Sequence, residues 1–267
     1  MQAIAKEMNF SETTFVLPPE RTDTDVRMRI FTPGDELPMA GHPTIGSTFA
    51  LARTGVIEPG RNRFVFGLGV GPVPVALTWT KDDLSFVWMT QGLPQFGEPV
   101  ADREAAASAI SLPSSVLGES LPVQSVSCGV PFVFIPLATR GDVDRAAVDR
   151  PALDALLADA GGGPHGVFLF SAEGGPDGAT AYSRMFAPAL GVAEDPATGI
   201  ASGPLGCYLV RHGLVAEEKA ARMLSLQGAK MGRPSHVHIS ITRRNGDITE
   251  VRVGGESVLA GEGTLYI

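Results

Sequence analysis

Three side chains in this sequence are placed to do acid/base chemistry, namely Glu12, His42 and Asp195. Glu12 opens the apolar run "SETTFVL", where partial burial would suit a general acid or base and exposure would make it an ordinary edge charge. His42 directly precedes a predicted helix, whose N-terminus disfavours an imidazolium, so we expect a neutral His42 that binds substrate or caps its loop. Asp195 lies three residues before Thr198, where we expect it to cap a second helix or, alternatively, to orient a substrate group.

The segments that carry His42 and Asp195 are two altered copies of one pattern. Residues 36–57 reappear at 194–215 with a constant offset, and the match continues upstream once a short insertion is allowed. The matched pairs are Arg29/Arg184, Phe31/Phe186, Glu36/Glu194, Pro38/Pro196, Gly41/Gly199, Leu51/Leu209, Arg53/Arg211 and Gly55/Gly213. Solenoid repeats recur at roughly 20 to 50 residues, so this much longer spacing predicts two halves built to one plan.

Each copy has an apolar strand, a Pro/Gly loop and then a helix that opens with small residues and ends before Gly55 or Gly213. Small residues leave the N–H groups at the start of the helix accessible, and the helix dipole adds to their preference for an anion. Taken singly, each copy is an ordinary strand-to-helix connection. Found twice, the pattern predicts one small anionic substrate held between two similar lobes.

Composition narrows the class of protein. The 267 residues are 44% hydrophobic and 19% charged, with a net charge of −8 and no block of Lys or Arg, which argues against nucleic acid or a membrane as partner. Cys128 and Cys207 form neither a metal knuckle nor a disulfide framework, and His236 and His238 have no third ligand nearby. With no leader and no apolar run near the roughly 18 residues of a spanning helix, we expect a cytoplasmic protein. Since no metal or cofactor motif is evident, we also expect it to work without either.

The periodicity predicts an α+β fold of two β-rich lobes, each with a central helix. We expect a first lobe over residues 1–95 and a second over 96–256, with a last strand in 257–267 that returns to the first lobe. Asn245 and Gly246 predict a hairpin between two long strands. The other expected strands cover residues 11–17, 26–31, 64–67, 71–79, 84–89, 166–171 and 180–186.

The segments "SETTFVLP", "RIFTPGDELPMAGHPTIGSTFAL" and "RMFAPALGVAEDPATGIASGPLGCYLVRHG" together resemble the PhzF family of phenazine-biosynthesis isomerases, and the likeness covers nearly the whole chain. It implies a diaminopimelate epimerase-like fold with one active site between the lobes, a homodimer, and acid/base isomerisation without a cofactor. The phenazine enzyme moves a proton from C3 to C1 of trans-2,3-dihydro-3-hydroxyanthranilate. By position Glu12 matches its proton shuttle, with His42 and Asp195 as polar supports.

The resemblance also implies substrate contacts, and here the chain departs from the family. A serine usually follows the glycine that matches Gly199, whereas this chain has Ile200, with Ser202 as the nearest replacement. Family members also carry a further strand pair before the segment that opens this chain, and without it the first lobe would expose a strand edge. The implied substrate-binding residues are Ser11, Gly41, Thr198, Gly199 and Ser202.

Two other functions remain open at this point. The substitution at Ile200 is compatible with a ligand-binding member of the same fold whose catalysis is impaired. An amino-acid epimerase is the third reading, but the epimerases of this fold use one cysteine per lobe at the two loops. Here Cys128 lies outside both loops and Cys207 lies deep in the second helix.

Overall fold

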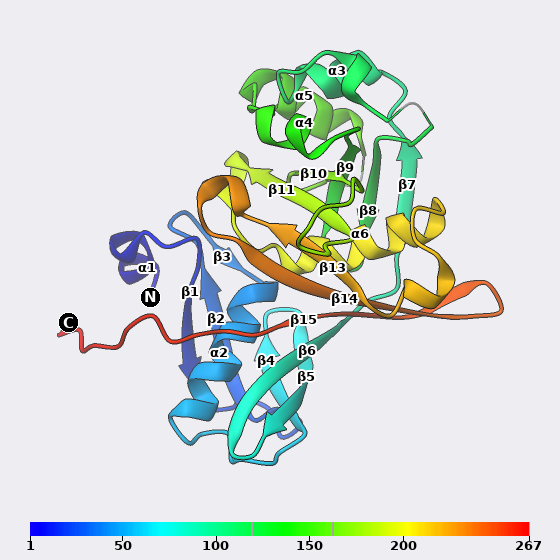
Figure 1. Cartoon of the computed structure of the whole chain (residues 1–267). Helices are drawn as coiled ribbons and strands as arrows, with labels where there is room; N and C mark the ends of the chain where they lie inside the picture. Colours follow the sequence, from blue (N-terminus) through cyan, green and yellow to red (C-terminus); the bar gives the residue numbers. More distant parts are fainter. Residues whose placement is uncertain (119, 162, 267) are drawn as a thin grey trace.

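The computed structural model describes residues 1–118, 120–161 and 163–266, and it consists of two lobes joined by one continuous sheet (Figure 1). Neighbouring strands along the sheet follow the order β1-β2-β4-β5-β6-β15-β14-β13-β11-β10-β9-β8-β7, with β3 paired to β2 and β12 paired to β11. Strands β1 and β7 are the two ends of this path and therefore lie at opposite ends of the sheet.

The N-terminal lobe wraps a curved set of strands around one helix. Helix α2 packs Ile45 and Leu51 against apolar side chains of the strands, including Met28 and Phe64. Its elements are α1 (Gln2–Met8), β1 (Thr13–Leu17), β2 (Val26–Phe31), β3 (Glu36–Leu37), α2 (Gly41–Arg53), β4 (Arg63–Leu68), β5 (Gly71–Thr80) and β6 (Asp83–Gln91). The strands predicted over residues 26–31, 64–67, 71–79 and 84–89 are therefore confirmed.

The C-terminal lobe has helices on both faces of its strands. Helix α6 packs Leu205 and Tyr208 into one core, and α3 and α5 cover the other face, where Leu153 is fully buried. Its elements are β7 (Gln95–Pro99), α3 (Arg103–Ser108), η1 (Ser114–Val116), β8 (Gln124–Ser127), β9 (Pro131–Pro136), α4 (Arg140–Arg145), α5 (Arg150–Asp159), β10 (Val167–Ser171), β11 (Ala181–Ala187), η2 (Pro188–Leu190), β12 (Val192–Asp195), α6 (Gly199–Arg211), η3 (Glu217–Lys219), β13 (Met223–Gln227), η4 (Ala229–Met231), β14 (Ser235–Arg244) and β15 (Asp247–Gly255).

Strand β15 serves both lobes. It forms a hairpin with β14 across Asn245 and Gly246, whose φ angles of 54° and 92° are those a two-residue turn requires, so the predicted hairpin is confirmed. Its C-terminal half also pairs with β6 of the N-terminal lobe. Val251 accordingly belongs to the core of the C-terminal lobe, and Val253 to that of the N-terminal lobe.

The internal repeat has a direct structural counterpart. Helices α2 and α6 both have 13 residues and begin at the matched glycines. In each lobe the matched arginine makes a two-pronged ion pair with the matched glutamate, Arg29 with Glu36 and Arg184 with Glu194. Each guanidinium also lies over the phenylalanine two positions along its strand, at 5.0 and 4.7 Å from the ring centroid. In both copies the same arginine–glutamate ion pair and arginine–phenylalanine contact thus hold the strand and the loop together.

The last predicted strand is wrong for the residues that the structure describes. Residues 256–266 lie outside every strand, and Val258 and Tyr266 are 91% and 95% exposed. The expectation rested on the local pattern of "TLYI", but a strand needs a free edge beside it, and no described strand pairs with this segment. Ile267, the last residue of the expected strand, lies outside the described residues.

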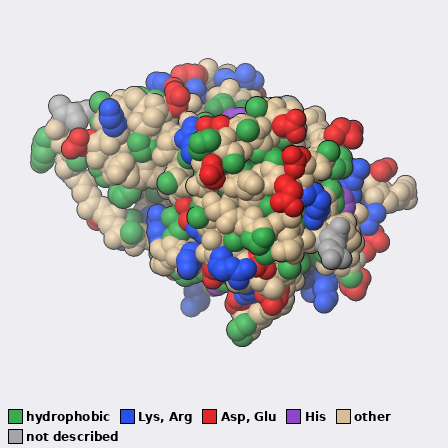
Figure 2. Space-filling view, turned by 90° about the horizontal axis from the view of Figure 1, so that it is seen from above, with side chains coloured by type: hydrophobic (Ala, Val, Ile, Leu, Met, Phe, Trp, Pro, Cys, Tyr) green, Lys and Arg blue, Asp and Glu red, His purple; other side chains and the backbone are tan. Residues whose placement is uncertain are grey.

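The face of the molecule seen in Figure 2 has no single extended charged patch. In the face seen in Figure 2, acidic and basic side chains are interspersed with apolar and neutral ones. No helix among the described residues is both long and apolar enough to cross a bilayer.

Candidate active site

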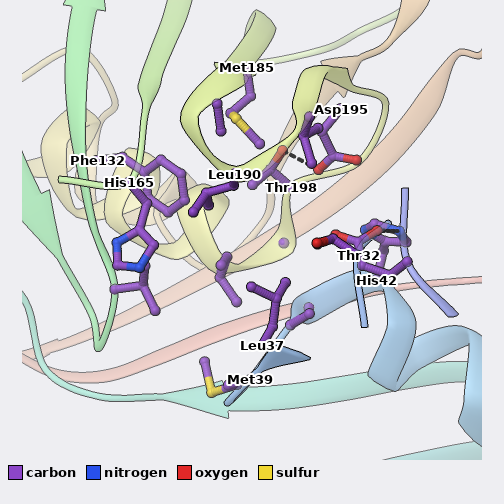
Figure 3. A pocket seen from close by; sticks show the side chains of 18 of the residues that line it. Thr32, Leu37, Met39, His42, Phe132, His165, Met185, Leu190, Asp195 and Thr198 are labelled. Carbon is purple, nitrogen blue, oxygen red and sulfur yellow. Dashed lines mark hydrogen bonds and ion pairs between the residues drawn. The ribbon is translucent and has the colours of Figure 1, made fainter. Parts of the chain in front are cut away.

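A cavity between the two lobes collects side chains from both copies of the repeat (Figure 3). Glu12 enters it from the loop before β1, His42 from the first turn of α2, and Asp195 from the end of β12. His165 lines the opposite end of the cavity, and the walls between it and these three groups are apolar. They are formed by Leu37, Pro38, Met39, Ala40, Val130, Phe132, Met185, Ala187, Leu190, Val192 and Ile200.

The three residues singled out for acid/base chemistry lie together. His42 Nε2 is 3.0 Å from Glu12 Oε2, and one polar atom of each of the three side chains lies within 4.8 Å of the others. The Glu12 side chain is 9% exposed and that of His42 is 34% exposed, while Asp195 is buried. Two carboxylates and one imidazole in so small a volume are suited to exchanging protons with a bound molecule.

The surroundings of His42 do not favour the expected neutral state. Burial lowers its pKa, but the close contact with Glu12 and the charges of Asp195 and Glu12 outweigh this and raise the pKa to about 9. The helix N-terminus does favour the neutral form, yet it acts through partial charges only, whereas the two carboxylates are full charges at contact distance. At neutral pH His42 is therefore an imidazolium.

This charge state predicts a specific pH dependence. Because the pKa of His42 is raised from 6.5 to about 9, its protonation stabilises the fold fully below pH 6.5, and that contribution is lost as pH rises through 9. An NMR titration of the His42 ring should give a midpoint near 9, and Glu12→Gln should move it downward. His212, whose pKa burial lowers, serves as the internal control. A midpoint below 6.5 for His42 would restore the neutral assignment.

Asp195 does not cap helix α6, contrary to the expectation. The N-cap is Thr198, which makes no side-chain cap hydrogen bond; its hydroxyl instead donates to Asp195 Oδ2 at 2.6 Å. Asp195 Oδ1 is buried and has no partner among the described residues. Burial raises the pKa of Asp195, the charge of His42 opposes this, and Glu12 adds to it. Asp195, which lines the cavity, thus keeps one unsatisfied oxygen.

Gln227 holds the Asp195 loop in place, and the sequence interpretation did not single it out. Its Nε2 donates to the Asp195 carbonyl at 2.7 Å and to Thr198 Oγ1 at 2.8 Å, and its Oε1 accepts the Thr198 N–H at 2.9 Å. The side chain is fully buried at the end of β13. Gln91 acts similarly from β6, because its Nε2 donates to the Gly199 carbonyl at 2.9 Å. The start of α6 is therefore fixed from both lobes.

Replacing Gln227 by leucine should destabilise the fold by about 2–6 kcal/mol, since the Thr198 N–H and the Asp195 carbonyl are left buried and unpaired at about 1–3 kcal/mol each. Urea denaturation followed by circular dichroism measures the change. Gln95→Leu makes the same chemical change at an exposed position of β7 and should cost little. Equal losses in the two variants would show that Gln227 has no special role.

The starts of α2 and α6 touch each other. A Cβ atom built on Gly41 would lie 2.8 Å from Gly199 Cα and 2.9 Å from Ile200 N, so only a glycine permits this approach. Each helix start leaves backbone N–H groups without intrahelical partners and carries the positive end of a helix dipole. The predicted amide-lined site is thus one feature made by two helices.

Comparison with known proteins identifies the family. A family model described as phenazine biosynthesis-like protein, PhzC-PhzF, matches residues 1–263. The chain belongs to the PhzF family.

Its relatives agree with this assignment. An uncharacterized isomerase of Mesorhizobium japonicum is 35% identical over 100% of this chain and 88% of its own length. The trans-2,3-dihydro-3-hydroxyanthranilate isomerase of Pseudomonas aeruginosa is 34% identical over 100% of this chain and 88% of its own length. The crystal structure of a PhzF-family phenazine biosynthesis protein of Bacillus anthracis superposes with a TM-score of 0.83 at 27% identity, covering 96% of this chain and 84% of that one. The expected two-lobed PhzF fold is confirmed.

The five expected substrate contacts do not all reach the cavity. Gly41, Thr198 and Gly199 line it, whereas Ser11 and Ser202 do not. Ser202 is fully buried and donates to the Thr198 carbonyl at 3.0 Å, so its hydroxyl is occupied in the helix and does not replace the family serine. Ile200 itself lines the cavity. This PhzF member therefore offers an apolar side chain where the family usually offers a hydroxyl.

The same cluster is also where a cation would fit best in this PhzF fold. Glu12, His42 and Asp195 are the only described residues whose ligand atoms group in this way, and a metal bound there would have to displace the proton that the raised pKa favours on His42. Cys128 and Cys207 lie 4.0 Å apart within the core of the C-terminal lobe, away from the cavity. Their mutual hydrogen bond and burial raise the pKa of Cys207, which disfavours a reactive thiolate.

Proposed function

We propose that the protein is a cofactor-independent isomerase that moves a proton between two carbons of a small cyclic carboxylate. The observation that carries this proposal is the cluster of Glu12, His42 and Asp195 at the junction of two helix starts. The substrate we propose is trans-2,3-dihydro-3-hydroxyanthranilate or a close analogue. Two relatives that are each 34% identical to this chain carry the name of the isomerase that acts on it.

In the proposed reaction Glu12 acts as base and then as acid. Its carboxylate takes a proton from one ring carbon, the C–H electron pair shifts the double bond along the ring, and the carboxylic acid so formed protonates a second carbon on the same face. No electrons are gained or lost. The imidazolium of His42, 3.0 Å away, keeps the Glu12 carboxylate oriented and compensates its charge before the first step and after the second.

The substrate carboxylate would bind at the starts of α2 and α6. The adjoining N–H groups and dipole ends favour a negative charge there, although the protein as a whole carries a net charge of −8. Oδ1 of Asp195, which is buried and has no partner among the described residues, can accept a hydrogen bond from an amino or hydroxyl substituent of the substrate.

Incubation with trans-2,3-dihydro-3-hydroxyanthranilate in deuterated water tests the proposal. We expect consumption of the substrate and a new carbon-bound deuterium at the site of protonation, both detected by NMR and mass spectrometry. Calorimetry with anthranilate run in parallel separates the alternative. Binding of anthranilate, together with no turnover of trans-2,3-dihydro-3-hydroxyanthranilate, would contradict the isomerase and favour a ligand-binding protein. Ile200 in the cavity wall is the observation that supports this alternative.

A further inference from the structure

The cavity has a second polar end that the proposed chemistry does not use. His165 lines it beside Phe132, on the side remote from Asp195 and His42, with Leu37, Leu190 and other apolar side chains between the two ends (Figure 3). His165 comes from the segment before β10 and Phe132 from β9, so the C-terminal lobe builds this end. The cavity is therefore polar at both ends and apolar between them.

His165 is held in place by its backbone but leaves its side chain incompletely satisfied. Its N–H donates to the Pro131 carbonyl at 2.9 Å, and its ring lies against Phe132 with centroids 6.5 Å apart. Its Nδ1 is buried and has no hydrogen-bond partner within the part of the chain that the structure describes. Buried polar atoms in folded proteins are nearly always paired, so an unpaired one on a residue that lines a cavity points to a missing partner.

The chemistry of this partner follows from the surroundings. Burial lowers the pKa of His165, so the ring is neutral and offers one donor and one acceptor. None of the described residues that line the cavity is a lysine or an arginine, so this end has no cation to bind a second acidic group. An uncharged hydroxyl or carbonyl at the end of an apolar body suits it best.

We propose that His165 sets substrate specificity by hydrogen bonding an uncharged polar group of the cyclic substrate at the end of the cavity opposite the substrate carboxylate. This inference rests on the proposed function for the orientation of the ligand, with its carboxylate at the helix starts. Ile200 supports it, since an apolar side chain there removes a polar contact near the reacting carbons and extends the apolar wall. In this proposal the polar contact that determines specificity comes from His165 and not from the residue after Gly199.

Two matched pairs of acids test the proposal by calorimetry. They are benzoate with 4-hydroxybenzoate, and 3-phenylpropanoate with 3-(4-hydroxyphenyl)propanoate. In at least one pair the wild-type protein should bind the hydroxylated acid about three- to tenfold more tightly, the size expected for one neutral hydrogen bond. His165→Leu should abolish that preference and leave the affinity for the acid without a hydroxyl unchanged. His165→Gln, which keeps a donor and an acceptor, should retain part of it.

Two further variants separate this inference from the reaction and from general damage. His236→Leu changes an exposed histidine outside the cavity and should keep the preference. Glu12→Gln should keep it too, even though turnover is lost, so failure of the isomerase proposal leaves this result standing. A preference that survives in His165→Leu, or its absence from both acid pairs in the wild-type protein, would overturn the role of His165.

Discussion

Replacing Glu12 by glutamine should lower the rate of isomerisation by about 10²–10⁴-fold, the usual contribution of a positioned general base. The substitution keeps the size and shape of the side chain but removes the group that accepts the proton. Glu12 has a side chain that is only 9% exposed and lies 3.0 Å from His42 Nε2, so bulk water does not readily take over its role. The rate of deuterium incorporation from solvent into substrate, measured by NMR, reports the proton transfer directly.

The matched control for this change is Glu7→Gln, which makes the same substitution on the exposed surface of α1. It should leave the rate unchanged. Circular dichroism and the midpoint of urea denaturation would show that both variants fold. If the Glu12 variant incorporated deuterium at the parental rate, a different residue would have to be the base, and the proposed mechanism would fail.

The second large effect is expected from Gly41→Ala. The added methyl group would lie 2.8 Å from Gly199 Cα and 2.9 Å from Ile200 N, and neither backbone atom can move without shifting the start of α6. Such overpacking costs about 1–3 kcal/mol of stability. The change also separates His42 from Asp195, and a displacement of about 1 Å in a catalytic group can cost about 10²-fold in rate. We therefore expect activity to fall more than stability alone explains.

Gly46→Ala is the matched control, because it lies in the same helix and a Cβ there meets nothing within 4 Å. It should gain about 0.5–1 kcal/mol by removing a helical glycine, and turnover should be retained. Urea denaturation and steady-state kinetics of both variants make the comparison. Parental activity in Gly41→Ala would mean that the close approach of the two helices has no part in the reaction.

The architecture could be predicted from the sequence because its main signals are local or repeated. The period-two strands and the Asn245-Gly246 turn depend on neighbours in the chain, and the structure confirms both. The repeat predicted two lobes, and the matched ion pairs of Arg29 and Arg184 show that even side-chain contacts were duplicated. The strand expected after residue 256 failed because strand pairing depends on a partner that local sequence does not reveal.

The three acid/base candidates that the fold brings together were singled out from the sequence, but their electrostatics were not predicted. Glu12, His42 and Asp195 were identified one by one, and a neutral His42 followed from the nearby helix start alone. Its actual charge depends on two carboxylates from distant segments, and only the fold brings them together. Gln227 and His165 were missed for the same reason. The likeness to the family covers nearly the whole chain and extends through the segment "LQGAKMGRPS", which contains Gln227, so the resemblance held a signal for that residue.

Strand β15 has a consequence for how the molecule can move. Its residues complete the hydrogen bonding of β14 on one side and β6 on the other, so the lobes cannot swing apart as independent bodies around a flexible linker. Any widening of the cavity has to come from bending of a shared sheet or from the loops at its mouth. Mechanical strain in one half is therefore transmitted to the other, and the whole chain should melt cooperatively.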